Sequence, residues 1–121
     1  MKGKIVVVED DPEILDLMEL LLKNLGYEPV LISNGLDALE HIQQEVPVLV
    51  LLDIIMSPIS GWEFLDQLRN NLGLKDLPVI LFTAAPTILD QMEKINDPHI
   101  CVLQKPASLA DLKKAIGSFG I

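Results

Sequence analysis

The chain has 121 residues, half of them hydrophobic, and a formal net charge of −9 at pH 7. This length suits a single domain with one core, so we expect residues 1–121 to form one domain. The mean hydropathy of +0.38 argues against intrinsic disorder, because ample apolar surface is available for burial. The acidic balance argues against nucleic-acid binding, since phosphate contacts need clustered lysine or arginine.

The chain shows no signal for a membrane or an oxidising compartment. No apolar run approaches the ~20 residues needed to span a bilayer, and the acids at Glu9, Asp10 and Asp11 follow the first apolar run too closely for a secretory signal. The single cysteine, Cys101, cannot form an internal disulfide and fits a reducing compartment. We therefore expect a cytoplasmic protein with no membrane partner.

Apolar, β-branched runs alternate with helical patterns along the whole chain. The predicted strands cover residues 4–9, 28–32, 48–53, 78–83 and 99–103. Strands that are apolar throughout are typical of a parallel sheet buried on both faces. The predicted helices run from Pro12 to just before Gly26, and over 34–44, 62–71, 87–95 and 108–118. Five strands, each followed by a helix, predict an α/β fold with a doubly wound five-stranded parallel sheet.

The first predicted helix has more apolar residues than a single core stripe needs. Asp10 or Asp11 precedes Pro12 as the cap, and a core stripe is predicted at Ile14, Leu17, Met18, Leu21 and Leu25. The surplus residues lie outside this stripe and are Leu15, Leu20 and Leu22. They indicate either a broad hydrophobic face or a docking surface. The last helix starts with an approximate capping box, Ser108 with Asp111.

Four predicted strand ends carry residues suited to chemistry. Glu9 and Asp10 end the first strand, Asp53 the third, and Thr83 the fourth, while Lys105 follows the fifth. Carboxyl ends of parallel strands share one edge of the sheet, where ligands bind in open α/β folds. Two carboxylates ~4 Å apart repel by roughly 4 kcal/mol at an effective dielectric of ~20, so the cluster needs a cation. Oxygen ligands with room for water suit Mg²⁺, and an aspartate beside Mg²⁺ can accept a phosphoryl group.

Five motifs in order, "IVVVEDDPEI", "LLDIIM", "GWEFL", "ILFTA" and "QKP", resemble the receiver (response-regulator, CheY-like) domain of two-component signalling. The resemblance covers essentially the whole chain and implies a flavodoxin-like (βα)5 fold with strand order 2-1-3-4-5. It implies Asp53 as phosphoacceptor, with Thr83 and Lys105 contacting the phosphoryl group. The Mg²⁺ ligands it implies are Asp10, Asp53, the Ile55 carbonyl, and Glu9 through water. It also implies a cis Lys105–Pro106 bond.

The same resemblance implies the partners. A sensor histidine kinase or histidine phosphotransfer protein would donate the phosphoryl group, and a downstream protein would read the altered surface. The domain would be a monomer or weak homodimer and would catalyse its own phosphorylation and slow dephosphorylation, without turning over an external substrate.

Three departures from the family pattern concern the geometry of the metal-binding loop, switching and the lifetime of the acyl phosphate. Ser57 stands where the family usually has proline, with Pro58 one residue later. Val102 replaces the usual tyrosine or phenylalanine, which predicts a muted or different switch. Ile55 and Ala85 cannot orient a hydrolytic water, which predicts a long-lived acyl phosphate.

Three other functions would each require different features of the sequence. An unphosphorylated pseudo-receiver interaction module is compatible with Ser57 and Val102. A haloacid-dehalogenase-like phosphohydrolase would need an aspartate at Ile55, and a flavodoxin-type FMN binder would need a phosphate loop where Glu9–Asp11 lie. His41 and His99 lack further ligands at a recognisable spacing and are predicted to be structural.

Overall fold

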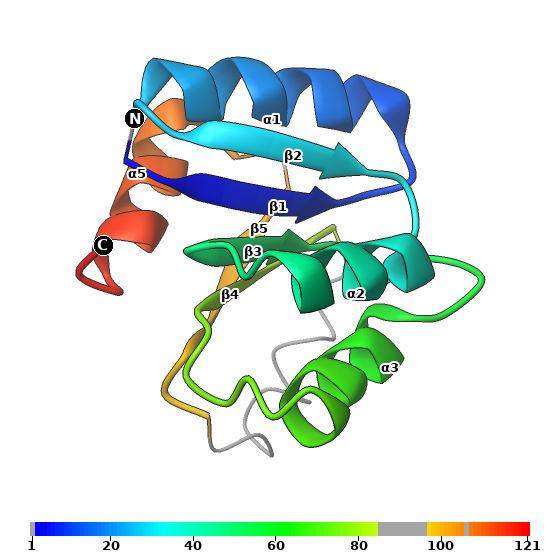
Figure 1. Cartoon of the computed structure of the whole chain (residues 1–121). Coiled ribbons are helices and arrows are strands. Elements are labelled where there is room, and N and C mark those ends of the chain that lie inside the picture. The colour runs from blue at the N-terminus through cyan, green and yellow to red at the C-terminus, as the bar shows by residue number, and fades with distance from the viewer. Residues whose placement is uncertain (1, 85–96, 106) are drawn as a thin grey trace.

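The computed structural model describes residues 2–84, 97–105 and 107–121. One parallel sheet has the strand order β2-β1-β3-β4-β5 (Figure 1), which confirms the predicted topology. Its strands are β1 (Lys4–Val8), β2 (Glu28–Ile32), β3 (Leu49–Leu52), β4 (Val79–Thr83) and β5 (Ile100–Gln104). The helices are α1 (Pro12–Asn24), α2 (Gly35–Gln44), α3 (Gly61–Asp66), which continues as the π-helix η1 (Gln67–Asn71), and α5 (Leu109–Gly117). The helix predicted over 87–95 lies outside the described residues.

The sheet is covered on both faces, and each face has its own core. Side chains of a strand alternate between the faces, so Val6 and Val8 pack with α2 and α3, whereas Ile5 and Val7 pack with α1 and α5. The central strands β1, β3 and β4 are therefore apolar on both sides, which is the physical reason for their unbroken hydrophobic runs. This arrangement is the doubly wound fold that the sequence predicts.

The caps of α1 and α5 follow the sequence prediction, and the α1 cap does not use Asp10. Asp11 is the N-cap of α1, because its Oδ1 accepts the Glu13 N–H at 2.9 Å. This decides between the two candidate caps. The capping box of Ser108 and Asp111 at α5 is confirmed.

The core stripe predicted for the first helix is wrong in part. Met18 and Leu22 are fully buried, whereas Leu17 is 43% and Leu20 is 66% exposed. The prediction placed Leu17 in the core and Leu22 outside it. A helix with apolar residues on most sides has no single preferred face, so contact with the sheet and with α5 decides which side is buried.

A close approach at Gly61 fixes the start of α3 against the end of β3. A Cβ atom at residue 61 would lie 2.5 Å from the Ile54 Cα and 2.7 Å from the Asp53 carbonyl oxygen. The Gly61 N–H donates to the Ile54 carbonyl at 2.8 Å. The chain between Asp53 and Gly61 is therefore held at both ends as a short loop at the carboxyl edge of the sheet.

The structure contains a cis peptide bond in the loop between β3 and α3. Among the described residues the cis peptide bond is Ser57–Pro58; the predicted cis bond at Lys105 involves Pro106, which lies outside the described residues. In the part of the chain that the structure describes, no helix has the length and apolar character needed to cross a bilayer.

Candidate functional site

Backbone hydrogen bonds carry the predicted site residues just past the ends of neighbouring strands. The Asp53 N–H donates to the Val8 carbonyl at 3.0 Å, which continues the β1–β3 ladder beyond β3. The Lys105 N–H donates to the Thr83 carbonyl at 2.9 Å, which does the same between β4 and β5. These residues therefore arise from strands that are adjacent in the sheet although they are remote in sequence.

Three carboxyl groups meet at this edge. One carboxylate oxygen from each of Glu9, Asp10 and Asp53 lies within 4.8 Å of the other two. Glu9 and Asp53 are buried, with 2% and 7% exposure, whereas Asp10 is exposed. Such a cluster is strongly repulsive unless a cation or protons compensate it.

Lys105 supplies one of the required positive charges. Its Nζ lies 2.7 Å from Glu9 Oε2 and 3.4 Å from Asp53 Oδ2, and its side chain is 15% exposed. Three carboxylates against one ammonium leave two negative charges uncompensated. Hard oxygen donors with this residual charge fit Mg²⁺, which binds one or two carboxylates and keeps several waters.

The other carboxylate oxygens are held by backbone donors. Glu9 Oε1 accepts the Asp11 N–H at 3.2 Å, and Asp53 Oδ1 accepts the Ile55 N–H at 3.2 Å. These bonds fix the rotamers of both acids before any ligand arrives. Preorganised oxygen atoms need little rearrangement on binding a cation.

Burial and the neighbouring charges of the site together raise the pKa of Glu9. Burial raises the pKa of its carboxyl from 4.5 to about 7; the hydrogen bond from Lys105 opposes the rise, and the neighbouring Asp53 adds to it. A cation in place of the proton would remove this penalty, because opposite charge favours the ionised form.

Thr83 and Ile55 differ in their surroundings. Thr83 ends β4 and is 1% exposed, so its hydroxyl is enclosed beside the strand that carries Asp53. Ile55, two residues after Asp53, is 68% exposed. The structure therefore brings Glu9, Asp10, Asp53 and Lys105 together, with Thr83 on the adjoining strand, whereas metal binding by the Ile55 carbonyl stays a prediction.

Sequence reasoning missed one neighbour of Lys105. The Lys105 Nζ lies 5.1 Å from the centroid of the Phe82 ring, and Phe82 is 4% exposed. The available signal was weak, since Phe82 merely precedes Thr83 in a buried strand. The contact joins residues of two different strands, so no pattern along the chain predicts it.

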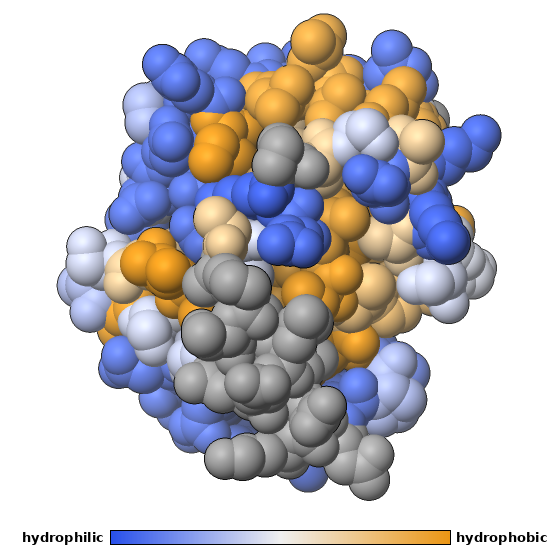
Figure 2. Space-filling model, turned by 180° about the vertical axis from the view of Figure 1, so that it is seen from behind, coloured by the Kyte–Doolittle hydropathy of each residue, from blue (hydrophilic) through white to orange (hydrophobic). Residues whose placement is uncertain are grey.

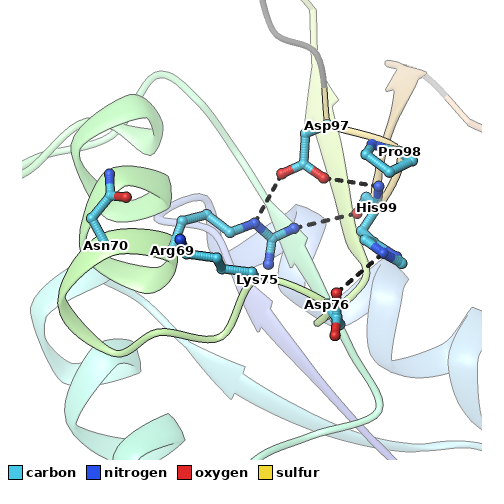
Figure 3. Close-up of a pocket in the computed structure, with 7 residues that line it drawn as sticks. All are labelled: Arg69, Asn70, Lys75, Asp76, Asp97, Pro98 and His99. Atoms are coloured by element: carbon cyan, nitrogen blue, oxygen red, sulfur yellow. Dashed lines mark hydrogen bonds and ion pairs between the residues drawn. The ribbon is translucent and has the colours of Figure 1, made fainter.

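A pocket separate from the acidic cluster lies at the opposite, amino-terminal end of β4 and β5 (Figure 3). It has a volume of about 400 Å³, and the buried Arg69 of η1 points into it. The Arg69 guanidinium donates to Asp97 Oδ2 at 3.0 Å and to the carbonyls of Leu74 and His99. Because the guanidinium already has three acceptors, we interpret this cluster as a structural link between η1 and the start of β5.

The structural roles predicted for His41 and His99 stay predictions. His99 Nε2 lies 3.4 Å from Asp76 Oδ1, and both residues line the pocket beside Arg69. Within the described residues, the set of three or more side chains able to hold one metal ion is Glu9, Asp10 and Asp53, and it includes neither histidine.

Comparison with known proteins agrees with this geometry. The family model for the response regulator receiver domain matches residues 5–117. A probable transcriptional regulator, ycf27, from Porphyra purpurea is 33% identical over 117 residues, which are 97% of this chain and 47% of that protein. The chain thus spans about half the length of the curated relatives it matches.

Two solved structures extend the comparison. The N-terminal domain of a response regulator receiver protein from Methanoculleus marisnigri JR1 is 33% identical, with a TM-score of 0.80 over 96% of this chain and 94% of that one. The receiver domain of a sensor histidine kinase from Pseudomonas aeruginosa PAO1, which has a magnesium ion in its active-site cleft, has a TM-score of 0.86 at 23% identity and full coverage of both chains. The fold, the family match and these relatives together show that the chain belongs to the response regulator receiver domain family.

Proposed function

We propose that this chain is a phosphorylation-dependent signalling switch in which Asp53 accepts a phosphoryl group. The observation that carries the proposal is the convergence of Asp53 with Glu9, Asp10 and Lys105 at one edge of the sheet. A buried carboxylate flanked by an ammonium and by further acids is suited to phosphoryl transfer, in which positioning and charge compensation supply most of the catalysis.

Each residue has a distinct role in this proposal. Asp53 is the nucleophile, and the N–H of Ile55 orients its carboxylate. Lys105 pairs with the incoming phosphoryl oxygens, and the Thr83 hydroxyl donates a hydrogen bond to one of them. Asp10 and Asp53 would hold Mg²⁺ directly, with the Ile55 carbonyl as a further ligand and Glu9 acting through water.

The proposed phosphoryl transfer is a displacement at phosphorus. An Asp53 carboxylate oxygen forms a new O–P bond while the P–N bond to the donor's phosphohistidine breaks. The electron pair of that bond stays on the imidazole nitrogen, which leaves as a neutral ring after taking up a proton. Bound Mg²⁺ supplies neutralisation of charge on the phosphoryl oxygens, and the magnesium in the Pseudomonas receiver domain supports the choice of this ion.

The competing functions have less support. A pseudo-receiver would not need an acceptor, an acidic pair and a lysine in contact, and all of these are present. A haloacid-dehalogenase-like hydrolase would need an acid where the exposed Ile55 lies. An FMN phosphate would meet the acids Glu9 and Asp10 at the end of β1.

The proposed partners are a phosphohistidine-bearing kinase or phosphotransfer protein and a downstream protein target. Leu17 and Leu20 of α1 are exposed, and apolar side chains gather along the upper edge of the molecule, where α1 runs (Figure 2). This surface supports the interpretation of α1 as a docking helix. A monomer or weak homodimer stays a prediction.

Incubation with acetyl phosphate and Mg²⁺, followed by intact-mass measurement, tests the acceptor. We expect one added phosphoryl group in the native protein and none in Asp53→Ala or when EDTA replaces Mg²⁺. Asp16→Asn is a matched control, since Asp16 is an exposed acid of α1 away from the site. Phosphorylation that persists in Asp53→Ala would overturn the assignment of Asp53, and its absence in the native protein would favour the pseudo-receiver.

A further inference from the structure

The ammonium group of Lys105 is enclosed on two sides by different kinds of neighbour. Glu9 and Asp53 lie at 2.7 and 3.4 Å from Nζ. The aromatic ring of Phe82 lies beneath it, with its centroid 5.1 Å away. The side chain of Lys105 is 15% exposed, so the charge is largely removed from water.

The sheet itself brings the ring to this position. Phe82 pairs with Leu103 in the β4–β5 ladder, and the backbone tie between Lys105 and Thr83 carries the lysine just beyond the end of β5. The Phe82 ring is 4% exposed and belongs to the core between the sheet, α1 and α5. A ring packed in this way has little freedom to move away from the ammonium.

The chemistry of the contact differs from that of an ion pair. The face of an aromatic ring is electronegative and attracts a cation within about 6 Å, more strongly when the cation is desolvated. The ring takes up no N–H donor in the way that a carboxylate does, so the three N–H donors of the ammonium remain available for oxygen atoms. The ring can therefore hold Lys105 in place without competing with a phosphoryl group for its hydrogen bonds.

We propose that Phe82 is a positioning residue that holds the Lys105 ammonium at Asp53 through a cation–π contact. The proposal rests on the proposed function, since it gives Phe82 a role in phosphoryl binding that acts through Lys105. An aliphatic side chain at residue 82 fills a similar part of the core but lacks the negative face. The ammonium then has Glu9 and solvent as alternatives, and its average position moves away from Asp53.

A graded substitution of the ring tests the contact with little change in shape. Phe82 is replaced site-specifically by 4-fluoro-, 3,5-difluoro- and 3,4,5-trifluorophenylalanine, which progressively weaken the negative face, and separately by leucine. Affinity for beryllofluoride, a phosphoryl mimic, is measured by calorimetry at saturating Mg²⁺. We expect a stepwise loss along the series, reaching about three- to tenfold for Phe82→Leu.

Two further readings separate positioning from general stability. The side-chain ε-protons of Lys105 should resonate upfield in the native protein because of the ring current, and should move downfield in Phe82→Leu. Ile80→Val removes a methylene from the same strand and the same core, so it controls for loss of packing. We expect it to leave both the beryllofluoride affinity and the Lys105 resonance unchanged.

The outcomes distinguish this proposal from the one on which it rests. Equal beryllofluoride affinity across the ring series, or an unshifted Lys105 resonance in the native protein, overturns the role of Phe82 while phosphorylation of Asp53 stands. A native protein that binds neither beryllofluoride nor a phosphoryl group overturns both proposals. An equal loss in Ile80→Val assigns the effect to packing and overturns the positioning role.

Discussion

Lys105 lies closer to Glu9 than to the proposed phosphoacceptor, with Nζ–O distances of 2.7 Å to Glu9 Oε2 and 3.4 Å to Asp53 Oδ2. Glu9 is the more buried of the two acids, so the ammonium compensates the charge that is most costly to desolvate. The ammonium of Lys105 thus supplies one of the positive charges that the three carboxylates require, and Mg²⁺ would supply the others. Removal of the Lys105 ammonium should affect metal binding and phosphoryl binding in opposite directions.

We expect Lys105→Met to tighten Mg²⁺ binding about fivefold or more, because two acids lose a competing positive charge. The same variant should lose beryllofluoride affinity, since the phosphoryl mimic loses its ion pair. Calorimetric titration measures both affinities. Lys113→Met, at an exposed lysine of α5, is the matched control and should change neither. Weaker Mg²⁺ binding in Lys105→Met would contradict the competition.

The raised pKa of Glu9 predicts a pH-dependent stability in the absence of metal. The folded protein holds this proton more tightly than the unfolded chain does, with a pKa of about 7 against 4.5. The free energy of unfolding should therefore fall as the pH rises from about 4.5 to 7, by up to about 3 kcal/mol. Urea unfolding in EDTA at several pH values measures this slope.

Two variants separate Glu9 from the other acids in that experiment. Glu9→Gln cannot ionise and should flatten the dependence between pH 4.5 and 7. Glu13→Gln, at an exposed acid in the first turn of α1, should retain it. An unchanged slope in Glu9→Gln would assign the effect to other groups.

Gly61 should tolerate no side chain. A methyl group there would overlap the Ile54 Cα and the Asp53 carbonyl oxygen, so Gly61→Ala should cost about 1–3 kcal/mol and weaken Mg²⁺ binding by displacing the end of β3. Gly117→Ala is the matched control, because nothing lies within 4 Å of its Cβ position. It should stabilise the protein by about 0.5 kcal/mol. Chemical denaturation measures both, and a neutral Gly61→Ala would contradict the close approach.

The ion pair of the buried Arg69 and the half-buried Asp97 should contribute to folding without affecting the metal site. Arg69→Met leaves the Asp97 carboxylate poorly compensated, since the two side chains are only 10% and 20% exposed, and should cost about 3 kcal/mol. Adding Asp97→Leu should recover part of that loss, which a double-mutant cycle measures. Because the pair lies at the other end of the sheet, Mg²⁺ affinity should stay unchanged, and a large change would link the two ends.

An acyl phosphate on Asp53 should be long-lived. The exposed side chain at residue 55 is aliphatic, so it cannot orient or activate a water for attack on phosphorus. Ile55→Glu should shorten the lifetime severalfold, and Ile55→Leu, the matched control, should leave it unchanged. Decay after removal of acetyl phosphate, followed by intact mass, measures the lifetime. A lifetime of seconds in the native protein would contradict this prediction.

Local sequence pattern was sufficient to predict the strands, most helices and the strand-end residues. Five short, mainly apolar runs alternating with helical patterns predicted a doubly wound parallel sheet, and motifs at the ends of those runs predicted which residues share its carboxyl edge. Parallel strands align their ends whatever lies between them, so Glu9, Asp10, Asp53 and Lys105 could be grouped from their places at strand ends. Caps such as Ser108 with Asp111 were likewise predictable, because they involve residues three apart.

Tertiary structure alone decided which of several locally equivalent choices is realised. The pattern of α1 allowed either Leu17 or Leu22 to face the core, and packing against the sheet and α5 selected Leu22. The partner of Lys105 among the acids, the Phe82 ring beneath it and the link from Arg69 to Asp97 all join residues from different elements. Such contacts depend on side-chain directions and distances across the sheet, which no periodicity along the chain encodes.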